Sequence, residues 1–217
     1  MSTSFFNTEK TGLAGISCIL SILFICICLF PSPSSAAQPD PSEVIRNFNA
    51  ALLDAMKRAD ELSYPGRYKL LGPVLRDSFA LSFMAAQSAG RYWKTLTDEE
   101  RSQLIKTYSE WTVATYAARF DGYSGEKFEV ASGPAAAQGA ATVVSKLIKS
   151  NAEEVRFHYL LRKIEGRWRV VDIQISGVSQ LALTRAQFAG VLKEKGYKGL
   201  ISMLKEKIRG FEKGGEK

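Results

Sequence analysis

The chain has 217 residues, of which 46% are hydrophobic, and its formal net charge is +7. This length is sufficient to bury one ordinary hydrophobic core without disulfides or metals. The sequence contains one histidine and three cysteines, and all three cysteines precede residue 29. Beyond that point the chain has no thiol, which excludes a cysteine nucleophile, a redox pair and a cysteine-ligated zinc site there.

The first 37 residues have the pattern of a secretory signal peptide. An apolar run over residues 16–30 follows Lys10 and precedes Ser34-Ser35-Ala36-Ala37, small residues that suit cleavage after the last of them. Two prolines end the run before it reaches the roughly 20 residues of a membrane-spanning helix. An uncleaved anchor is the alternative interpretation. We therefore expect a signal peptide over residues 1–37 and an exported domain over residues 38–217.

Export narrows the choice of partner. Nucleotide cofactors and nucleic acid are not normally available to an exported protein, so no cofactor and no nucleic-acid partner are predicted. The net charge of +7 then favours anionic lipid headgroups or an acidic partner. A basic excess that serves only solubility is the alternative.

Three helices are expected in the first half of the exported part. The first begins at Asp40-Pro41, where the aspartate can cap it and the proline suits its first turn, and it ends at Tyr64-Pro65-Gly66. The second covers residues 67–90 and is apolar almost all round, which indicates cover on several sides. The third follows a capping box at Thr97-Asp98-Glu99-Glu100 and continues to Phe120 with apolar residues at helical spacing.

After Gly122 the periodicity changes to that of strands. Turn residues separate four expected strands, over residues 127–132, 140–148, 154–164 and 167–176. Apolar and polar residues alternate in the third, so one face of the sheet is predicted to be buried and the other to face solvent. Connections this short predict a four-stranded antiparallel meander.

The chain then returns to helix. A capping box at Thr184-Arg185-Ala186-Gln187 predicts one helix, and Gly196 and Gly199 bracket the start of a last one. Helices, then strands, then helices predict a single α+β domain. Wide apolar stripes that converge on a small sheet suit either a filled core or an apolar cavity, and the pattern alone does not separate the two.

Residues with catalytic chemistry are few. His158 lies mid-strand on the face expected to be wet, where a histidine is more often incidental than catalytic. Asp172 is the one acid in an apolar stretch, and pairing with an arginine is its expected role. The sequence has no Gly-x-Ser-x-Gly elbow, glycine-rich phosphate loop or run of metal-binding acids. The chain is therefore not predicted to be an enzyme, and no catalytic or metal-binding residue is assigned.

Several short segments between about Phe79 and Lys207 carry a resemblance to a known family. They are Gly90-Arg91-Tyr92-Trp93, Tyr123-Ser124-Gly125-Glu126-Lys127, Tyr159-Leu160-Leu161-Arg162, Gly166-Arg167-Trp168-Arg169-Val170-Val171-Asp172-Ile173, Ile175-Ser176-Gly177-Val178-Ser179, Arg185-Ala186-Gln187-Phe188 and Gly199-Leu200-Ile201. In this order and spacing they resemble the MlaC (toluene tolerance Ttg2D-type) family of periplasmic lipid carriers, which are auxiliary components of ABC transporters. Thr184 stands where the family pattern has a tyrosine. With Phe120-Asp121-Gly122-Tyr123, this makes the chain most similar to the hopanoid-associated HpnM branch.

The resemblance implies a fold and a function. The fold would be a single domain in which helices cover a strongly curved antiparallel sheet, an NTF2-like or cystatin-like arrangement, with lipid tails held in an apolar pocket between the layers. The function would be that of a soluble periplasmic carrier that shuttles lipid, hopanoid or phospholipid, between the inner and outer membranes. Its partners would be an inner-membrane lipid transporter with an MCE-type component and an outer-membrane lipoprotein complex.

Periodicity assigns eleven residues to a shared apolar interior, where some are expected to contact lipid. They are Phe79, Phe83, Trp111, Phe157, Tyr159, Leu161, Ile173, Ile175, Val178, Phe188 and Val191. A non-catalytic adaptor with a filled core, and a small-molecule enzyme with a polar base inside the cavity, are the competing functions.

Cations cluster around the last two predicted helices. They are Lys193, Lys195, Lys198, Lys205, Lys207 and Arg209. The last three are expected to dock onto an acidic partner or an anionic membrane surface, because long-range fields raise encounter rates. A solvated basic face is the alternative.

Overall fold

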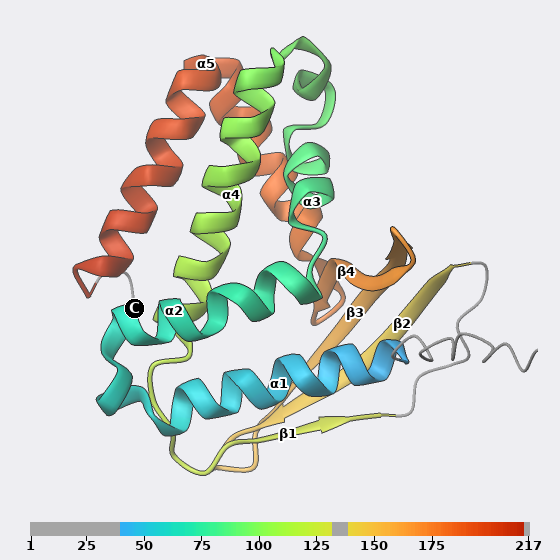
Figure 1. Cartoon of the computed structure of the whole chain (residues 1–217), viewed down its shortest axis with the longest axis vertical. Coiled ribbons are helices and arrows are strands. Elements are labelled where there is room, and N and C mark those ends of the chain that lie inside the picture. The colour runs from blue at the N-terminus through green and yellow to red at the C-terminus, as the bar shows by residue number, and fades with distance from the viewer. Residues whose placement is uncertain (1–39, 132–138, 215–217) are drawn as a thin grey trace, which may run out of the picture. The chain divides into compact units, whose positions relative to one another are not determined.

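The computed structural model describes residues 40–131 and 139–214 (Figure 1). The expected signal peptide, its cleavage after Ala37 and the anchor alternative lie outside these residues. The elements in chain order are α1 (Pro41–Lys57), α2 (Ala59–Ser78), α3 (Leu81–Ala89), the 3-10 helix η1 (Gly90–Thr95), α4 (Asp98–Arg119), β1 (Lys127–Val130), β2 (Ala140–Ile148), β3 (Glu154–Ile164), β4 (Arg167–Ile175), β5 (Val178–Ser179) and α5 (Gln180–Glu212).

The described residues form a curved antiparallel sheet with helices packed on it, so the predicted α+β fold is confirmed. The strand order is β1-β2-β3-β4-β5, and each strand is antiparallel to its neighbour. The bounds predicted for β2 and β3 are those observed, but the prediction of four strands is wrong because it missed β5. That strand has two residues, too few for alternation to reveal it.

Two tight turns set the last hairpins. Glu165-Gly166 joins β3 to β4, and Ser176-Gly177 joins β4 to β5. In both turns the first residue has φ of 51° and the glycine has φ of 78°. Such left-handed pairs match the twist of the flanking strands, which is why two-residue hairpin loops adopt them.

A β-bulge in β4 decides which of its side chains face the helices. The pairing register shifts between Leu160 and Leu161, and Val171 is the extra residue on β4. Val170 and Ile173 therefore reach the same face of the sheet although they are three residues apart. Both are buried in the core.

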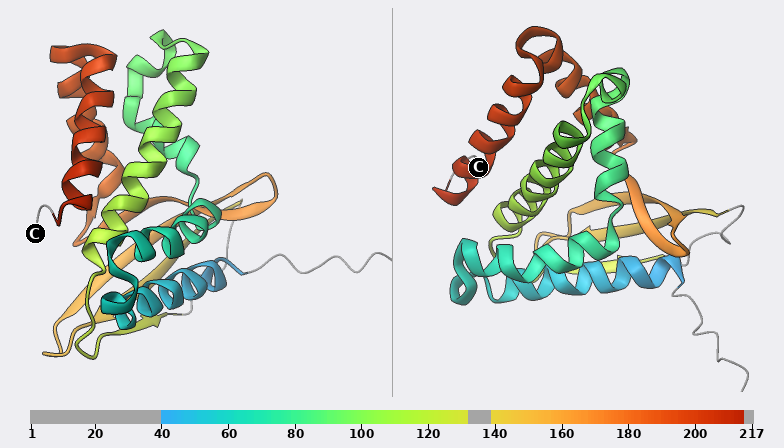
Figure 2. Two further views of the ribbon diagram at one scale, coloured as in Figure 1. Left: turned by 60° about the vertical axis from the view of Figure 1, so that its left-hand side comes forward. Right: turned by 45° about the horizontal axis from the view of Figure 1, so that its top comes forward.

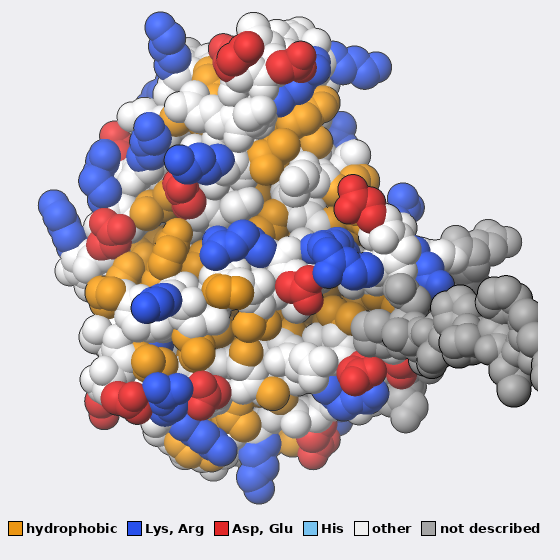
Figure 3. All heavy atoms as spheres, in the orientation of Figure 1, with side chains coloured by type: hydrophobic (Ala, Val, Ile, Leu, Met, Phe, Trp, Pro, Cys, Tyr) orange, Lys and Arg blue, Asp and Glu red, His pale blue; other side chains and the backbone are white. Residues whose placement is uncertain are grey.

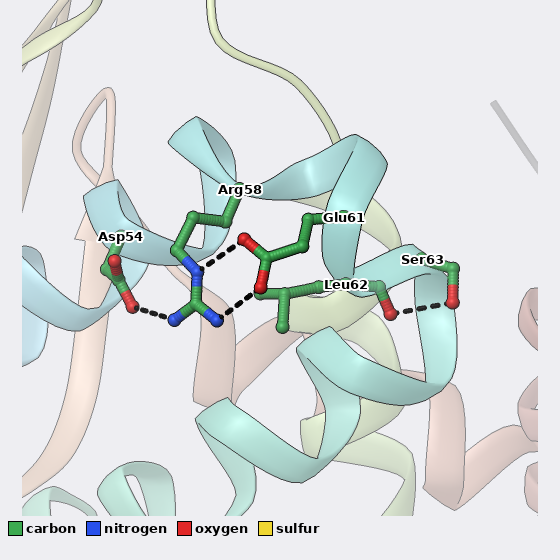
Figure 4. Close-up of polar contacts among 5 residues, drawn as sticks. All are labelled: Asp54, Arg58, Glu61, Leu62 and Ser63. Carbon is green, nitrogen blue, oxygen red and sulfur yellow. Dashed lines mark hydrogen bonds and ion pairs between the residues drawn. The ribbon is translucent and has the colours of Figure 1, made fainter.

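The first predicted helix is in fact two helices, because the chain turns after Lys57. Arg58 stabilises this turn: its Nε and Nη2 donate to the two carboxylate oxygens of Glu61 at 3.0 and 2.8 Å, and its Nη1 donates to Asp54 at 3.3 Å (Figure 4). The guanidinium lowers the pKa of the Glu61 carboxyl. A second break follows within α2 at Ser63, whose φ is 49°.

The second predicted helix, over residues 67–90, is also interrupted. At Phe79 the backbone becomes extended and forms an isolated parallel bridge with Val170 of β4. The amide of Ala80 donates to the Val170 carbonyl at 2.9 Å, and α3 begins at the next residue. The expectation of one continuous helix is wrong because this hydrogen bond to the sheet replaces a helical one.

The helices form two groups on the sheet. α1 lies along the sheet with α2 beside it, whereas α3, α4 and α5 rise away from it (Figures 1 and 2). The predicted capping box at the start of α4 is confirmed: the Thr97 hydroxyl accepts from the Glu100 amide, and the Glu100 carboxylate accepts from the Thr97 amide.

The long helix α5 begins earlier than predicted. Ser179 caps it by accepting from the Ala182 amide at 3.0 Å. The expected start at Thr184 is wrong, since that hydroxyl donates to the Gln180 carbonyl inside the helix. The predicted break at Gly196 is confirmed, because this residue has φ of 65° and divides α5 into two helical parts.

Asp172 ties the start of α5 to β4. Its Oδ1 accepts from the Ile173 amide at 2.8 Å and from the Leu181 amide at 3.0 Å. The expected pairing with an arginine is wrong: among the ion pairs of residues 40–131 and 139–214, Asp172 takes no part. A carboxylate near helical amides is favourable because it satisfies donors that have no partner in the helix.

Asp172→Ala should lower the free energy of unfolding by about 1–3 kcal/mol, because two amides lose a buried acceptor. Urea denaturation measures the change. Asp121→Ala is the control, since Asp121 is exposed in the loop after α4. Equal stability of the two variants would contradict the role of Asp172 in anchoring α5.

Candidate functional site

A cavity of about 470 Å³ lies between the inner face of the sheet and the helices α4 and α5. Most of its wall is aromatic or aliphatic. The apolar lining consists of Leu52, Phe79, Met84, Tyr108, Trp111, Tyr116, Phe120, Phe128, Phe157, Tyr159, Ile173, Ile175, Leu181 and Leu183. Leu183 is 53% exposed, so the cavity opens to solvent beside the first turns of α5.

Regular periodicities build the walls. On α4, lining residues recur at three- and four-residue intervals from Tyr108 to Phe120, so one face of the helix forms one wall. On the sheet, Phe157 and Tyr159 alternate along β3, and Ile173 and Ile175 alternate along β4. The bulge in β4 keeps the second pair in register with the first.

Aromatic packing supports one part of the cavity wall. Phe48 of α1 is fully buried, and its ring meets the rings of Phe79, Tyr116 and Tyr159 edge-on at 5.0, 5.5 and 6.3 Å. Edge-on contacts at these distances are favourable beyond their burial. This part of the wall is therefore fixed by mutual packing.

The threonine hydroxyls of the wall are already engaged within their own helices. The hydroxyls of Thr112, Thr115 and Thr184 donate to backbone carbonyls four residues earlier in their own helices, at 2.8–2.9 Å. Two cations, Arg119 at the end of α4 and Lys207 in the second part of α5, also line the cavity. Neither takes part in the ion pairs found among the described residues.

Among the tyrosines of the wall, Tyr108 and Tyr159 are buried and Tyr116 is half-buried. Burial raises the pKa of Tyr108 to about 12 and raises the pKa values of Tyr116 and Tyr159 above their ordinary range. These hydroxyls therefore stay protonated at neutral pH.

The structure brings six of the eleven predicted interior residues to the cavity wall. They are Phe79, Trp111, Phe157, Tyr159, Ile173 and Ile175. Leu161 and Phe188 lie in the core with no exposed surface, and Val191 packs against that core. Phe83 lines a separate cavity of about 370 Å³ near the break between α2 and α3.

The placement of Val178 in the interior is wrong. Its side chain is 46% exposed, although it pairs with the cavity residue Ile175 across the last hairpin. The reason is its position on a two-residue edge strand, where no helix covers it. Sequence reasoning also missed Tyr108, Tyr116 and Phe120, although all three lie on the apolar stripe predicted for α4.

Of the other sequence candidates, only Lys207 lines the cavity. His158 is half-buried and pairs in the sheet with Val144 and Gln174, on the strand face opposite to Tyr159. Lys205 and Arg209 are exposed on α5, and Lys207 is half-buried at the cavity. In the described ranges, no cluster of His, Cys, Asp and Glu could hold a metal ion. No helix in the same ranges has both the length and the apolarity to cross a membrane.

Comparison with known families identifies the chain. The sequence model of the MlaC protein family matches residues 46–206, which include every residue that lines the cavity except Lys207. The chain belongs to the MlaC family. The predicted resemblance is thereby confirmed at the level of the family.

Two relatives share about a quarter of their aligned residues with this chain. The chain is 25% identical over 130 residues to the intermembrane phospholipid transport system binding protein MlaC of Haemophilus influenzae, and this match spans 58% of the chain and 61% of that protein. It is 24% identical over 189 residues to the toluene tolerance protein ttg2D of Pseudomonas putida, over 83% of the chain and 86% of that protein.

A solved structure supports the same fold. The phospholipid-binding protein of Ralstonia solanacearum, determined in complex with a phospholipid, has a TM-score of 0.71 and 22% sequence identity. The alignment covers 80% of this chain and 99% of that one. The helices and curved antiparallel sheet described above are therefore an arrangement that solved structures already contain.

The buried tyrosines make stability depend on alkaline pH. Between pH 10 and about 12, Tyr108 loses its proton in the unfolded chain but keeps it in the folded one, so the unfolded state binds fewer protons and the free energy of unfolding falls. A difference of about two pKa units corresponds to about 3 kcal/mol. Urea denaturation at pH 8 and pH 11.5 should show a smaller loss for Tyr108→Phe than for the wild type. Equal losses would contradict this assignment.

Proposed function

We propose that the chain is a non-catalytic lipid carrier that holds the apolar part of one lipid in the cavity. The observation that carries this proposal is the cavity itself: about 470 Å³ lined mostly by aromatic and aliphatic side chains, with two cations in its wall. Each methylene buried there contributes about 0.8 kcal/mol, so a lipid tail supplies affinity without directed polar contacts. A pure adaptor would have a filled core, whereas this structure has a cavity.

The names of two relatives support this proposal. They describe a phospholipid transport system binding protein and a phospholipid-binding protein. We infer a periplasmic location for residues 38–217 after removal of a signal peptide over residues 1–37. The carrier would shuttle lipid between the inner and outer membranes and help to maintain the lipid organisation of the outer membrane.

The proposal also covers the partners and the cargo of the carrier. The inferred partners are an inner-membrane lipid transporter with an MCE-type component and an outer-membrane lipoprotein complex. The cargo is hopanoid or phospholipid. The support for membership of the HpnM branch is the sequence at Thr184 and at Phe120-Asp121-Gly122-Tyr123. Thr184 also lies in the cavity wall, so a change there alters the surface that cargo meets.

Ile175→Trp should reduce the lipid that co-purifies with the protein, because the larger side chain occupies part of the cavity. Organic extraction followed by mass spectrometry identifies and quantifies that lipid, and it distinguishes hopanoid from phospholipid. Val178→Trp is the matched control, since Val178 faces Ile175 across the same hairpin but is exposed. Equal lipid content in the two variants would count against the cavity as the lipid site. A wild-type extract without lipid would count against the carrier.

The basic surface of α5 is inferred to guide docking onto an acidic partner or an anionic membrane. Lys205, Lys207 and Arg209 lie in the second part of α5, and Lys and Arg side chains follow the edge of the molecule that this helix occupies (Figure 3). Exposed charges of one sign steer encounters over a distance that shrinks from about 30 Å to about 8 Å as ionic strength rises from 0.01 to 0.15 M.

Lys205→Glu combined with Arg209→Glu should therefore slow lipid transfer to anionic vesicles several-fold at low salt and much less at physiological salt. Lys207 is left unchanged because it lines the cavity. The control pair is Lys94→Glu with Lys106→Glu, two exposed lysines near the start of α4 and within it. Identical transfer rates for both loaded variants at low salt would remove the docking role.

A further inference from the structure

Two tyrosines line the cavity from different walls. Tyr116 belongs to α4 and Tyr159 to β3, and both line the cavity. Their rings pack edge-on against the same ring, that of Phe48, at 5.5 and 6.3 Å. Tyr159 is only 2% exposed. The two side chains are thus neighbours at the inner part of an otherwise apolar space.

These hydroxyls have unused hydrogen-bonding capacity. The tyrosine hydroxyls that form hydrogen bonds among the described residues are those of Tyr92 and Tyr197, and neither Tyr116 nor Tyr159 is among them. A shielded polar group without a partner is unfavourable, and most such groups in proteins have one. A phenol also retains its proton to donate, whereas the threonine hydroxyls of the wall already donate to their own helices.

A cation lies next to this polar spot. Arg119 follows Tyr116 by three residues on α4, a rise of about 4.5 Å along a helix, and it also lines the cavity. Its charge is close enough to oppose the rise that burial causes in the pKa of Tyr116. Arg119 is exposed and Tyr116 is half-buried, so the order from solvent inward is cation, then phenol, then apolar wall.

This order matches the polar part of an ester-linked glycerophospholipid. In such a lipid the phosphate and the nearer acyl ester are attached to adjacent carbons of one glycerol, and the tails begin directly beyond the ester. A phosphate beside Arg119 would leave an ester carbonyl, which can only accept, within the reach of phenols that can donate. A polycyclic hydrocarbon lipid has no oxygen at that depth.

We propose that Tyr116 and Tyr159 determine cargo specificity by donating hydrogen bonds to an ester carbonyl of a glycerophospholipid whose phosphate lies beside Arg119. The inference rests on the proposed function and names the class of cargo: a lipid with ester-linked chains and an anionic phosphate. The two phenols hold the linkage between headgroup and tails, and the rest of the cavity binds the tails without directional contacts.

The test compares two phospholipids that differ only in this linkage. Delipidated protein is incubated with vesicles of diester phosphatidylglycerol or of its dialkyl ether analogue with the same chain length, and the lipid bound to the protein is quantified. The wild type should bind the diester about 2- to 10-fold better, as expected for one net hydrogen bond. The double variant Tyr116→Phe with Tyr159→Phe should bind both lipids alike, at the level at which the wild type binds the ether.

Tyr64→Phe is the matched control, because the Tyr64 hydroxyl is buried without a partner and Tyr64 does not line the cavity. This variant should keep the preference for the diester. The delipidated double variant should unfold at the same temperature as the wild type or higher, since it loses only unpaired hydroxyls. A lower unfolding temperature would mean that the phenols have partners within the protein, and it would overturn the proposal.

The remaining outcomes distinguish a failure of the ester site from a failure of the proposed carrier function. Equal binding of diester and ether by the wild type, or a preference retained by the double variant, overturns the ester site and leaves the carrier intact. Uptake of neither phospholipid, with a hopanoid in the cell extract, also overturns the ester site alone. A protein that takes up no phospholipid and carries no lipid from the cell overturns the proposed function as well.

Discussion

Phe79 holds the helical part of the molecule to the sheet. Its backbone forms a parallel bridge with Val170, and the neighbouring Ala80 amide donates to the same strand. Its ring meets Phe48 at 5.0 Å and Tyr116 at 6.0 Å. One extended residue therefore joins α1, α4 and β4. Because the helix must stop there, α3 leaves in a new direction, and α4 and α5 rise from the sheet with it.

The cavity follows from this geometry. Helices that lie flat on a sheet fill the space above it with side chains, as α1 does through Ile45, Phe48 and Leu52. Helices that rise from the sheet leave a wedge that side chains of ordinary size do not fill. An empty apolar wedge is unfavourable because its wall atoms lack dispersion contacts on one side. A bound lipid tail would restore those contacts, so the same feature that weakens the empty protein favours the loaded one.

Much of this fold can be predicted from the sequence because local signals are strong. Alternation in β2 and β3, the turn at Glu165-Gly166 and the capping box at Thr97 each follow from a few adjacent residues. The break at Phe79 and the bulge at Val171 do not, because both depend on pairing with residues far away in the sequence. Around the bulge, Val170, Val171, Asp172 and Ile173 are all buried. The one polar residue among them, Asp172, is itself buried, so its position does not indicate where the register changes.

The cavity lining can be predicted from the sequence to a similar extent. Periodicity identifies which face of α4 and of the strands is apolar, but a residue that touches another side chain and a residue that faces an empty space have the same character. Leu161 and Ile173 both alternate inward, yet only Ile173 lines the cavity. Val178 is expected in the interior but is exposed, because it lies on a two-residue strand at the edge of the sheet. The departure of the helices from the sheet decides these cases, and no single segment encodes it.

The break of α5 at Gly196 changes how the basic residues of that helix should be understood. A helix has a partial negative charge at its C-terminal end, and a cation in the last turn stabilises it by about 0.3–1 kcal/mol. Because Gly196 divides α5, the helix has two such ends. Lys193 and Lys195 lie in the last turn before the break, and Arg209 lies in the last turn of the second part. Part of the positive charge of α5 thus balances the dipoles of its own two segments, and these three cations have a structural reason to be present before any partner approaches.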